Sequence, residues 1–300
     1  MQISVALYPR FSNLCLANTI EPLRAANDLG GRTLFEWSVV SPGGGPVTSS
    51  SRLEIATEPL REAQGDMLIL MPSYEFAAAT TADNRAILRS AAQRFGTLAG
   101  FDMGAWLLAD AGLLDGRRAT VHWDELEAFS EAFPDVRAER ARHLRDADRL
   151  TCAGASAAFD VMLDLVEAEG GAALRLDVAL LFIQPGAAGR PGAPGAGSRR
   201  VAALLELMGD HLEEPLPLPE IAARAGLSLR SLDRLVNERL STTPAALYRR
   251  LRLLKAKKLV LETDMAVTEI ALRTGYTDAS AMTRAFRQHF GQPPRAFRQE

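Results

Sequence analysis

The stretch Glu220-Ile-Ala-Ala-Arg-Ala-Gly-Leu-Ser228 returns 49 residues later as Glu269-Ile-Ala-Leu-Arg-Thr-Gly-Tyr-Thr277, with five of the nine positions identical. Beyond these stretches the similarity continues at an offset of 50, which indicates one inserted residue in the second turn. A short helix, a glycine turn and a second amphipathic helix, present twice, are typical of paired helix-turn-helix units. We therefore predict an all-α C-terminal domain that binds promoter DNA.

The overall composition is that of a globular protein of two domains. The chain has 300 residues, of which 47% are hydrophobic, and no run approaches the roughly 18 apolar residues of a membrane span. The N-terminus lacks a basic region and a cleavage site and predicts a first strand. Two cysteines, Cys15 and Cys152, make no disulfide framework. We expect a cytoplasmic protein, nucleoid-associated when bound to DNA, with no membrane partner.

The charge is distributed unevenly along the chain. Residues 198–300 hold 17 Lys and Arg against 12 Asp and Glu, a net charge of +5, whereas the preceding residues hold 17 against 25, a net charge of −8. A cationic part joined to an acidic one fits a phosphate-binding domain attached to a domain that does not touch DNA.

The segment 184–198 is rich in Gly, Pro and Ala without apolar periodicity, which predicts a linker between a domain at 1–183 and one at 199–300. Before the linker, apolar runs alternate with helical patterns, which favours an α/β sandwich with a mostly parallel sheet flanked by helices. The predicted strands are 3–7, 35–40, 66–71 and 97–101, and the predicted helices are 14–29, 82–95, 104–111, 124–133 and 157–169.

Each second helix of the repeat has a buried stripe and a polar face. The inward positions are predicted to be Leu229, Leu232, Leu235 and Val236 in the first helix, and Met282, Ala285 and Phe286 in the second. The candidate DNA-binding residues on the other faces are Arg230, Asp233, Arg234, Ala279, Ser280, Thr283 and Arg284.

Arginine binding guanine through two hydrogen bonds is the commonest specific contact, so Arg234 and Arg284 are the first candidates for base contacts. Asp233 can accept from cytosine or pair with a neighbouring arginine. Five further basic residues are expected either to contact phosphates or to form a solvated face: Arg249, Arg250, Lys255, Lys257 and Lys258.

The last 100 residues or so resemble the AraC/XylS family of bacterial transcription regulators. The motifs are the two repeated stretches, the segment 244–261, and Thr283-Arg284-Ala285-Phe286-Arg287 followed by Phe290-Gly291. The resemblance implies that a helix over 245–261, roughly 25 Å long, holds both recognition helices in successive major grooves about 34 Å apart. Ser241 stands where the family usually has glycine, so that helix end is expected to be looser.

The first 183 residues resemble the ThiJ/PfpI family, a glutamine-amidotransferase-like α/β fold, and the two parts together give the architecture of GlxA-type regulators. The match is most specific from Gly104 to Trp123. Enzymes of this fold carry a nucleophilic Cys on a tight strand-to-helix turn, where a thiolate attacks the substrate. Here Asp102 occupies that position and neither cysteine matches it, so we expect no enzymatic activity, no catalytic residue and no cofactor.

The resemblance places an acidic residue, Glu21, near the same turn. Two carboxylates in one cavity share a proton or attract a cation, and aromatic faces favour a quaternary ammonium or guanidinium group. We therefore predict a small cationic effector, betaine-, carnitine- or arginine-like. The predicted ligand-binding residues are Asp102, Glu21, Tyr74, Trp106, His122 and Trp123.

Structural roles compete with these functional ones. Trp106 fits a core position, His122 fits either a vestigial base or a structural histidine, and Asp102 fits a helix cap. Tyr74 and Glu75 stand where the family commonly has a Gly-Gly loop.

The sequence as a whole predicts a one-component transcriptional regulator, a homodimer that acts with RNA polymerase and holds no metal. The alternatives are a ThiJ/PfpI-like amidase or hydratase with a DNA-binding tail, and a ligand-free dimerisation scaffold.

Overall fold

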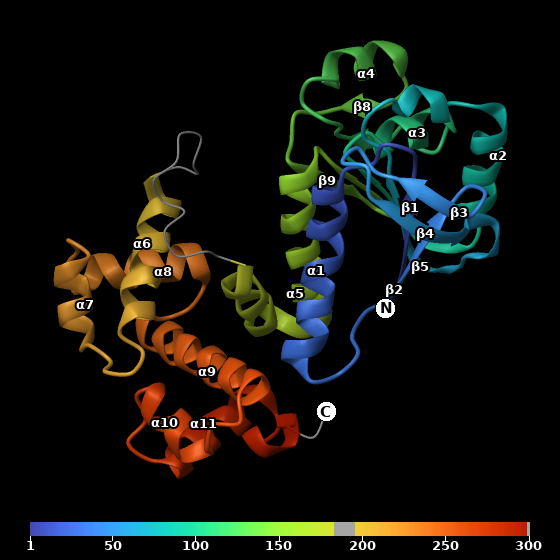
Figure 1. Ribbon diagram of the computed structural model, residues 1–300. Helices are drawn as coiled ribbons and strands as arrows, with labels where there is room; N and C mark the ends of the chain where they lie inside the picture. Colours follow the sequence, from blue (N-terminus) through green and yellow to red (C-terminus); the bar gives the residue numbers. More distant parts are fainter. Residues whose placement is uncertain (183–195, 299–300) are drawn as a thin grey trace. The chain divides into compact units, whose positions relative to one another are not determined.

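A computed structural model describes residues 1–182 and 196–298 of the chain (Figure 1). Their contacts divide the chain into two compact units, Met1–Asp28 with Arg32–Arg175, and Leu29–Gly31 with Leu176–Glu300. Most of the predicted linker at 184–198 lies outside the described residues, and helix α6 begins at Ala196.

The first unit is built on an eight-stranded sheet with the order β3-β4-β2-β1-β5-β6-β10-β9. The strands from β4 to β10 pair in parallel, while β3 and β9 are antiparallel edges. The central residue Val5 of β1 lies opposite Val39 and Ile69. The strands are β1 Gln2–Leu7, β2 Glu36–Ser41, β3 Gly45–Thr48, β4 Glu54–Pro59, β5 Gly65–Met71, β6 Phe95–Phe101, β9 His143–Asp146 and β10 Arg149–Cys152.

Helices cover both faces of this sheet. Figure 1 shows α1 and α5 beside each other, and Asn18 of α1 donates to the Ala155 carbonyl at the start of α5 at 2.8 Å. Residues of α2, α3 and α4 form a buried cluster with strand residues such as Leu68 and Leu98. The helices are α1 Asn13–Gly30, α2 Ala82–Ala91, α3 Gly104–Asp110, α4 Leu126–Ala132 and α5 Ala155–Phe182, and a small ladder joins β7 Arg118–Ala119 to β8 Arg137–Ala138.

The predicted fold class is confirmed, and the four predicted strands and five predicted helices all appear. The helix predicted at 82–95 was too long, because α2 ends at Ala91 and Phe95 already begins β6. The helix predicted at 157–169 was too short, since α5 extends to Phe182 with a break at Gly171 (φ 83°, ψ 166°), a conformation essentially restricted to glycine.

The second unit is helical, as predicted. After α6 come two helix pairs joined by the long helix α9, and a short 3₁₀ turn follows the last helix. The bounds are α6 Ala196–Asp210, α7 Leu218–Arg224, α8 Leu229–Leu240, α9 Pro244–Glu262, α10 Val267–Arg273, α11 Ala279–Phe290 and the turn Pro294–Arg298.

The core of the second unit has two parts. One packs α6, α7 and α8 with the start of α9 and with Leu176 and Leu180 from the end of α5. The other packs the later part of α9 with α10 and α11. Each helix pair therefore has its own core, and α9 belongs to both.

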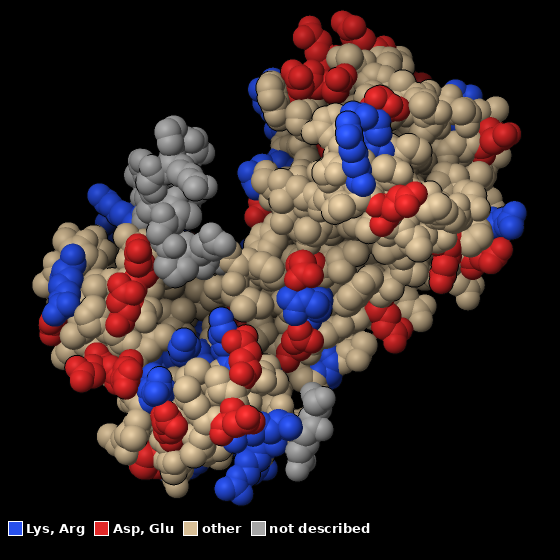
Figure 2. Space-filling view, viewed as in Figure 1, with Lys and Arg blue, Asp and Glu red and all other residues tan. Residues whose placement is uncertain are grey.

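The surface in the view of Figure 2 carries charges of both signs. Acidic side chains gather over α4, whereas Lys and Arg are interspersed with acidic residues on the C-terminal helices. Within the described residues, no helix combines the length and the apolar character needed to cross a bilayer.

Candidate functional sites

The two helix-turn-helix units have the same turn geometry. In the first, Leu227 N donates to Ala222 O, and in the second, Tyr276 N donates to Ala271 O, both at 2.8 Å. The glycine before each donor has a positive φ, 66° at Gly226 and 72° at Gly275. L-residues with a Cβ rarely adopt this conformation, which explains why both copies of the repeat carry glycine.

The helix ends explain why the offset changes from 49 to 50. The N-cap of α8 is Ser228, and the N-cap of α11 is Asp278, 50 residues later. Thr277 is therefore the inserted residue. At the other end, Ser241 (φ 49°) and Gly291 (φ 78°) both close their helices in the left-handed conformation. Ser241 thus occupies the position usual for glycine, as the resemblance implied, at some conformational cost.

The recognition helices α8 and α11 each border a surface hollow, of about 470 Å³ and 720 Å³ respectively. Arg230, Asp233 and Arg234 line the first hollow. The other four predicted DNA-binding residues, Ala279, Ser280, Thr283 and Arg284, line the second. The structure therefore gathers the seven residues on two equivalent faces. Sequence reasoning missed further lining residues with polar side chains: Ser231, Asn237, Thr268, Arg295 and Arg298.

Ion pairing separates two classes of arginine in these units. Arg224 pairs with Glu220 at 2.6 Å and Arg273 pairs with Glu269 at 3.1 Å, each within its own helix. The repeated Glu and Arg thus serve the short first helices. On the recognition helices, by contrast, Arg230, Arg234 and Arg284 form no ion pair with other described residues, and Asp233 does not pair with a neighbouring arginine.

The second turn is supported by contacts that the first turn lacks. Arg252 of α9 donates to the carbonyls of Thr274 and Gly275 at 2.6 and 2.7 Å, and its guanidinium lies 4.2 Å from the centre of the Tyr276 ring. A Cβ on Gly275 would lie 2.6 Å from the Leu212 carbonyl oxygen and 2.4 Å from Pro215. The loop after α6 therefore packs directly against the second turn.

Three predictions about the helical unit were wrong. Leu229 was expected to be buried but is 50% exposed, because it begins α8 on the outer side. Lys257 was expected at the surface but is buried, with its ammonium over the rings of Phe290 and Phe297. Arg250 forms an ion pair with a buried carboxylate, so it is not a solvated or phosphate-binding side chain.

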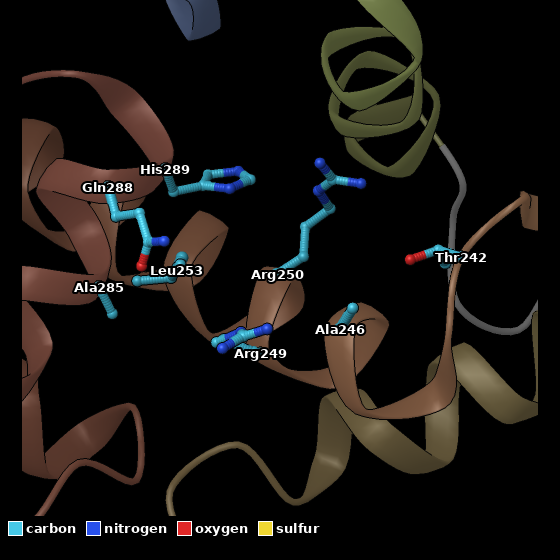
Figure 3. Close-up of a pocket in the computed structure, with 8 residues that line it drawn as sticks. All are labelled: Thr242, Ala246, Arg249, Arg250, Leu253, Ala285, Gln288 and His289. Atoms are coloured by element: carbon cyan, nitrogen blue, oxygen red, sulfur yellow. The ribbon is translucent and has the colours of Figure 1, made fainter.

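That carboxylate belongs to Asp177, which lies beside a third hollow of about 300 Å³ between α9 and α11. Arg250 Nε lies 2.6 Å and His289 Nε2 2.9 Å from the two Asp177 oxygens. Figure 3 shows Arg250 and His289 extending from different helices into the same hollow, with Arg249 below them. One carboxylate therefore ties the linking helix to the second recognition helix.

In the first unit, Asp102 lies at the turn between β6 and α3. Its backbone is left-handed (φ 57°), as in the strained strand-to-helix turn that presents a nucleophile. The turn is tight, because a Cβ on Gly104 would meet the Leu70 carbonyl oxygen at 2.3 Å. Burial raises the pKa of the Asp102 carboxyl above its ordinary value, while a hydrogen bond from Ser73 and the nearby His122 lower it.

Two buried cysteines lie in the electrostatic surroundings of Asp102. Burial raises the pKa of the Cys15 thiol well above its usual range, and the nearby Cys152 and Asp102 raise it further. Burial also raises the pKa of the Cys152 thiol to about 12. Both thiols are therefore protonated at neutral pH, and a protonated thiol is a poor nucleophile. Ser73, Cys15 and Cys152 are members of this group that sequence reasoning did not assign.

The structure separates the remaining predicted ligand-binding residues. The Glu21 carboxylate is held by Arg24 at 2.7 Å on α1. Trp106 packs among Phe76, Phe129 and Phe133, with ring centroids 5.1 to 5.8 Å away, which fits its core alternative.

The other two aromatic candidates are largely exposed. Tyr74 is 58% and Trp123 is 63% exposed, and the Trp123 ring lies 5.5 Å from that of His122. Of the six predicted residues, the structure thus places His122 near Asp102, and Trp123 lies beside His122. Among the described residues, no three His, Cys, Asp or Glu side chains are placed to hold a metal ion.

Comparisons with known proteins agree with this two-part structure. Residues 221–300 match the family model described as helix-turn-helix domain, and residues 9–168 match the DJ-1/PfpI family. Among solved structures, an AraC family transcriptional regulator from Pseudomonas putida is 26% identical with a TM-score of 0.52, covering 60% of this chain and 98% of its own. A THiJ/PfpI family protein from Pseudomonas syringae is 26% identical with a TM-score of 0.50, covering 70% and 86%.

Two relatives align with almost the whole chain, across both parts. The HTH-type transcriptional regulator CdhR of Pseudomonas aeruginosa is 35% identical over 96% of this chain and 88% of its own length. GlxA of Rhizobium meliloti, also an HTH-type transcriptional regulator, is 33% identical over 99% and 95%. The chain therefore belongs to the HTH-type transcriptional regulators that join an N-terminal DJ-1/PfpI domain to a C-terminal AraC-type helix-turn-helix domain.

Proposed function

We propose that the chain regulates transcription by inserting α8 and α11 into successive major grooves of promoter DNA. The observation that carries this proposal is the pair of equivalent hollows, each lined by an exposed arginine that forms no salt bridge with another described residue. An exposed guanidinium without a protein partner is available for guanine. Arg234 and Arg284 are the proposed base readers, followed by Arg230 and Ser280.

Selection from random DNA duplexes with the full-length protein would give the preferred sequence. Anisotropy titrations would then compare R234A and R284A with R224A and R273A, in which the removed arginine is paired within its own helix. Loss of a bidentate base contact costs about 1–3 kcal/mol, so R234A and R284A should each weaken binding and relax the preference at one base pair. Equal losses in all four variants would contradict the assignment.

We propose further that the first unit senses a small cationic metabolite and is catalytically disarmed. The thiols of Cys15 and Cys152 are buried and protonated, and Asp102 replaces a nucleophile that would need to be ionised and exposed. Betaine-, carnitine- and arginine-like compounds are the proposed effector class. A thermal-shift screen with such compounds would test this, since a ligand at about 100 times its Kd stabilises by about 2.7 kcal/mol.

The competing function is that of an enzyme with a DNA-binding tail. The left-handed backbone of Asp102 at the strand-to-helix turn favours it, because this conformation presents a nucleophile in related folds. Amidase or hydratase turnover that is abolished in D102N would support the enzyme. Activity that emerges only in D102C would support disarmament.

Dimerisation and contact with RNA polymerase complete the proposal. Two copies on repeated half-sites gain effective concentration and therefore affinity. Sedimentation with and without the selected DNA would measure the oligomeric state. Full regulation after the effector site is blocked would favour a ligand-free scaffold instead.

A further inference from the structure

The first unit has a hollow of about 290 Å³, and none of the six predicted ligand-binding residues lines it. It lies where β1, β2 and β5 end: Tyr8 follows β1, Pro42 follows β2, and Glu75 and Phe76 belong to the segment after β5. The opening of α2, with Asp83 and Asn84, completes the wall.

The sheet topology favours ligand binding at this hollow. The connection from β1 leads through α1 to β2 on one side, whereas the connection from β5 leads through α2 to β6 on the other. In open α/β sheets, ligands bind in the crevice outside the carboxyl ends of the strands where the connections diverge.

The charged groups at this hollow are carboxylates. Glu75 and Asp83 are the ionisable acids of its wall, and no Lys, Arg or His is among the described residues that line it. Glu75 is paired with Arg10 at 3.0 Å. Asp83 forms no ion pair within the described part of the chain and is exposed. One carboxylate is therefore available to a cation.

The rest of the wall suits a cation with an apolar body. Phe76, Tyr8 and Pro42 offer ring surfaces, and aromatic faces attract ammonium and guanidinium groups. The buried Asn84 amide accepts from the Tyr8 hydroxyl at 3.3 Å and donates to Ala79 O at 2.9 Å. Since each amide nitrogen has two hydrogens and each hydroxyl two lone pairs, further hydrogen-bonding capacity remains at this buried pair.

The loops at the rim are held in a strained arrangement. Arg10 (φ 62°) and Glu75 (φ 56°) are both left-handed non-glycine residues. Their side chains form the ion pair, and Tyr74 N donates to Arg10 O at 3.4 Å. Such conformations cluster at active sites and ligand-binding sites.

From these observations we infer that the effector, a small organic cation, binds in this hollow, with Asp83 as its anionic contact and Phe76 as its aromatic wall. The inference rests on the proposed sensing function and moves the site away from Asp102.

Intrinsic fluorescence distinguishes the two positions. The Phe76 ring lies 5.1 Å from that of Trp106, whereas the exposed Trp123 lies beside His122, which is the residue near Asp102. Full-length wild-type, W106F and W123F proteins would be titrated with choline, glycine betaine and L-arginine. The highest ligand concentration would be roughly 10 mM, which exceeds a Kd of about 1 mM and so covers weak binding. Ligand in the hollow should change the fluorescence of W123F but much less that of W106F.

Calorimetry on charge-matched variants supplies the second readout. D83N and F76A should weaken binding at least tenfold. D102N and the control E62Q should leave binding unchanged, since Glu62 is an exposed carboxylate that does not line the hollow. Binding lost in D102N but kept in D83N would overturn the proposed position. The absence of binding by all three probes would overturn the cationic class. Anisotropy with selected DNA is independent of these results, so a failure of the regulator itself would be seen separately.

Discussion

Alanine at Gly275 should destabilise the helical unit considerably more than alanine at Gly226, although the two glycines are equivalent in the repeat. Both have a positive φ, 72° and 66°. An L-residue in the left-handed conformation costs about 1–2 kcal/mol, and this cost applies to both variants.

The difference comes from the surroundings of the added methyl group. At Gly226 nothing lies within 4 Å of the Cβ position. At Gly275 the Cβ would lie 2.6 Å from the Leu212 carbonyl oxygen and 2.4 Å from Pro215 Cγ. Overpacking of this kind costs about 1–3 kcal/mol. The expected losses are therefore about 1–2 kcal/mol for G226A and about 2–5 kcal/mol for G275A.

Urea unfolding of the full chain can report the two units separately. All three tryptophans, Trp37, Trp106 and Trp123, lie in the first unit, so tryptophan fluorescence follows that unit alone, whereas far-ultraviolet circular dichroism follows both. With a slope of about 1–3 kcal/mol per molar urea, G275A should shift the dichroism transition of the helical unit by one to a few molar, roughly twice the shift of G226A. The fluorescence midpoint should not move.

Equal shifts in G226A and G275A would refute the close approach of the loop after α6 to the second turn. A shift of the fluorescence midpoint in either variant would show that the two units do not unfold independently.

Three further predictions concern single polar contacts. Burial raises the pKa of Asp102 in the folded state, so its contribution to stability is present below the unfolded pKa of about 4 and is lost as pH rises through the folded value. D102N should therefore be more stable than wild type at neutral pH, and tryptophan-monitored urea midpoints that coincide at every pH would exclude this. D177A leaves Arg250 and His289 without their carboxylate and should lower the free energy of unfolding of the helical unit by about 3–5 kcal/mol. The double variant D177A/R250M should recover part of this loss in urea unfolding followed by circular dichroism. R252M removes two hydrogen bonds to the second turn and should weaken protection of the half-site bound by α11 in footprinting, whereas equal loss at both half-sites would argue against a local role.

Local features of the helical unit could be predicted from the sequence. The glycine turns, the alanines and the spacing of apolar residues depend on neighbours within a few positions, and all of them recur in the structure. The exposed residues of the recognition helices follow from the same periodicity, which is why the seven predicted DNA-binding residues line the two hollows. The predicted burial of Leu229 was wrong because the first residue of a helix has fewer helical neighbours to cover it.

Features that depend on distant segments were missed. Arg250 resembles any surface arginine in the sequence, because its partner Asp177 lies 73 residues away. Lys257 is buried because two rings from later elements surround its ammonium. The short strands β3 and β4 carry proline, glycine and exposed polar residues, so no apolar run indicates them.

The six predicted ligand-binding residues followed a resemblance along the chain, which does not fix where each side chain points. They stay a prediction. Trp106 turns into an aromatic cluster, and the Glu21 carboxylate pairs with Arg24. The hollow beside Tyr8 and Asp83 is lined by segments that follow three different strands, so no single stretch of the sequence predicts it.

The end of α5 decides where an independently folding DNA-binding fragment must begin. Leu176 and Leu180 precede the Gly- and Pro-rich segment, yet they belong to the core shared by α6, α8 and α9, and Asp177 neutralises Arg250. A fragment that starts at 199 would expose apolar side chains and leave a buried cation bare. A fragment that folds on its own should therefore begin after the break at Gly171. A chimera joined there should fold and bind DNA, whereas one joined inside the Gly- and Pro-rich segment should aggregate.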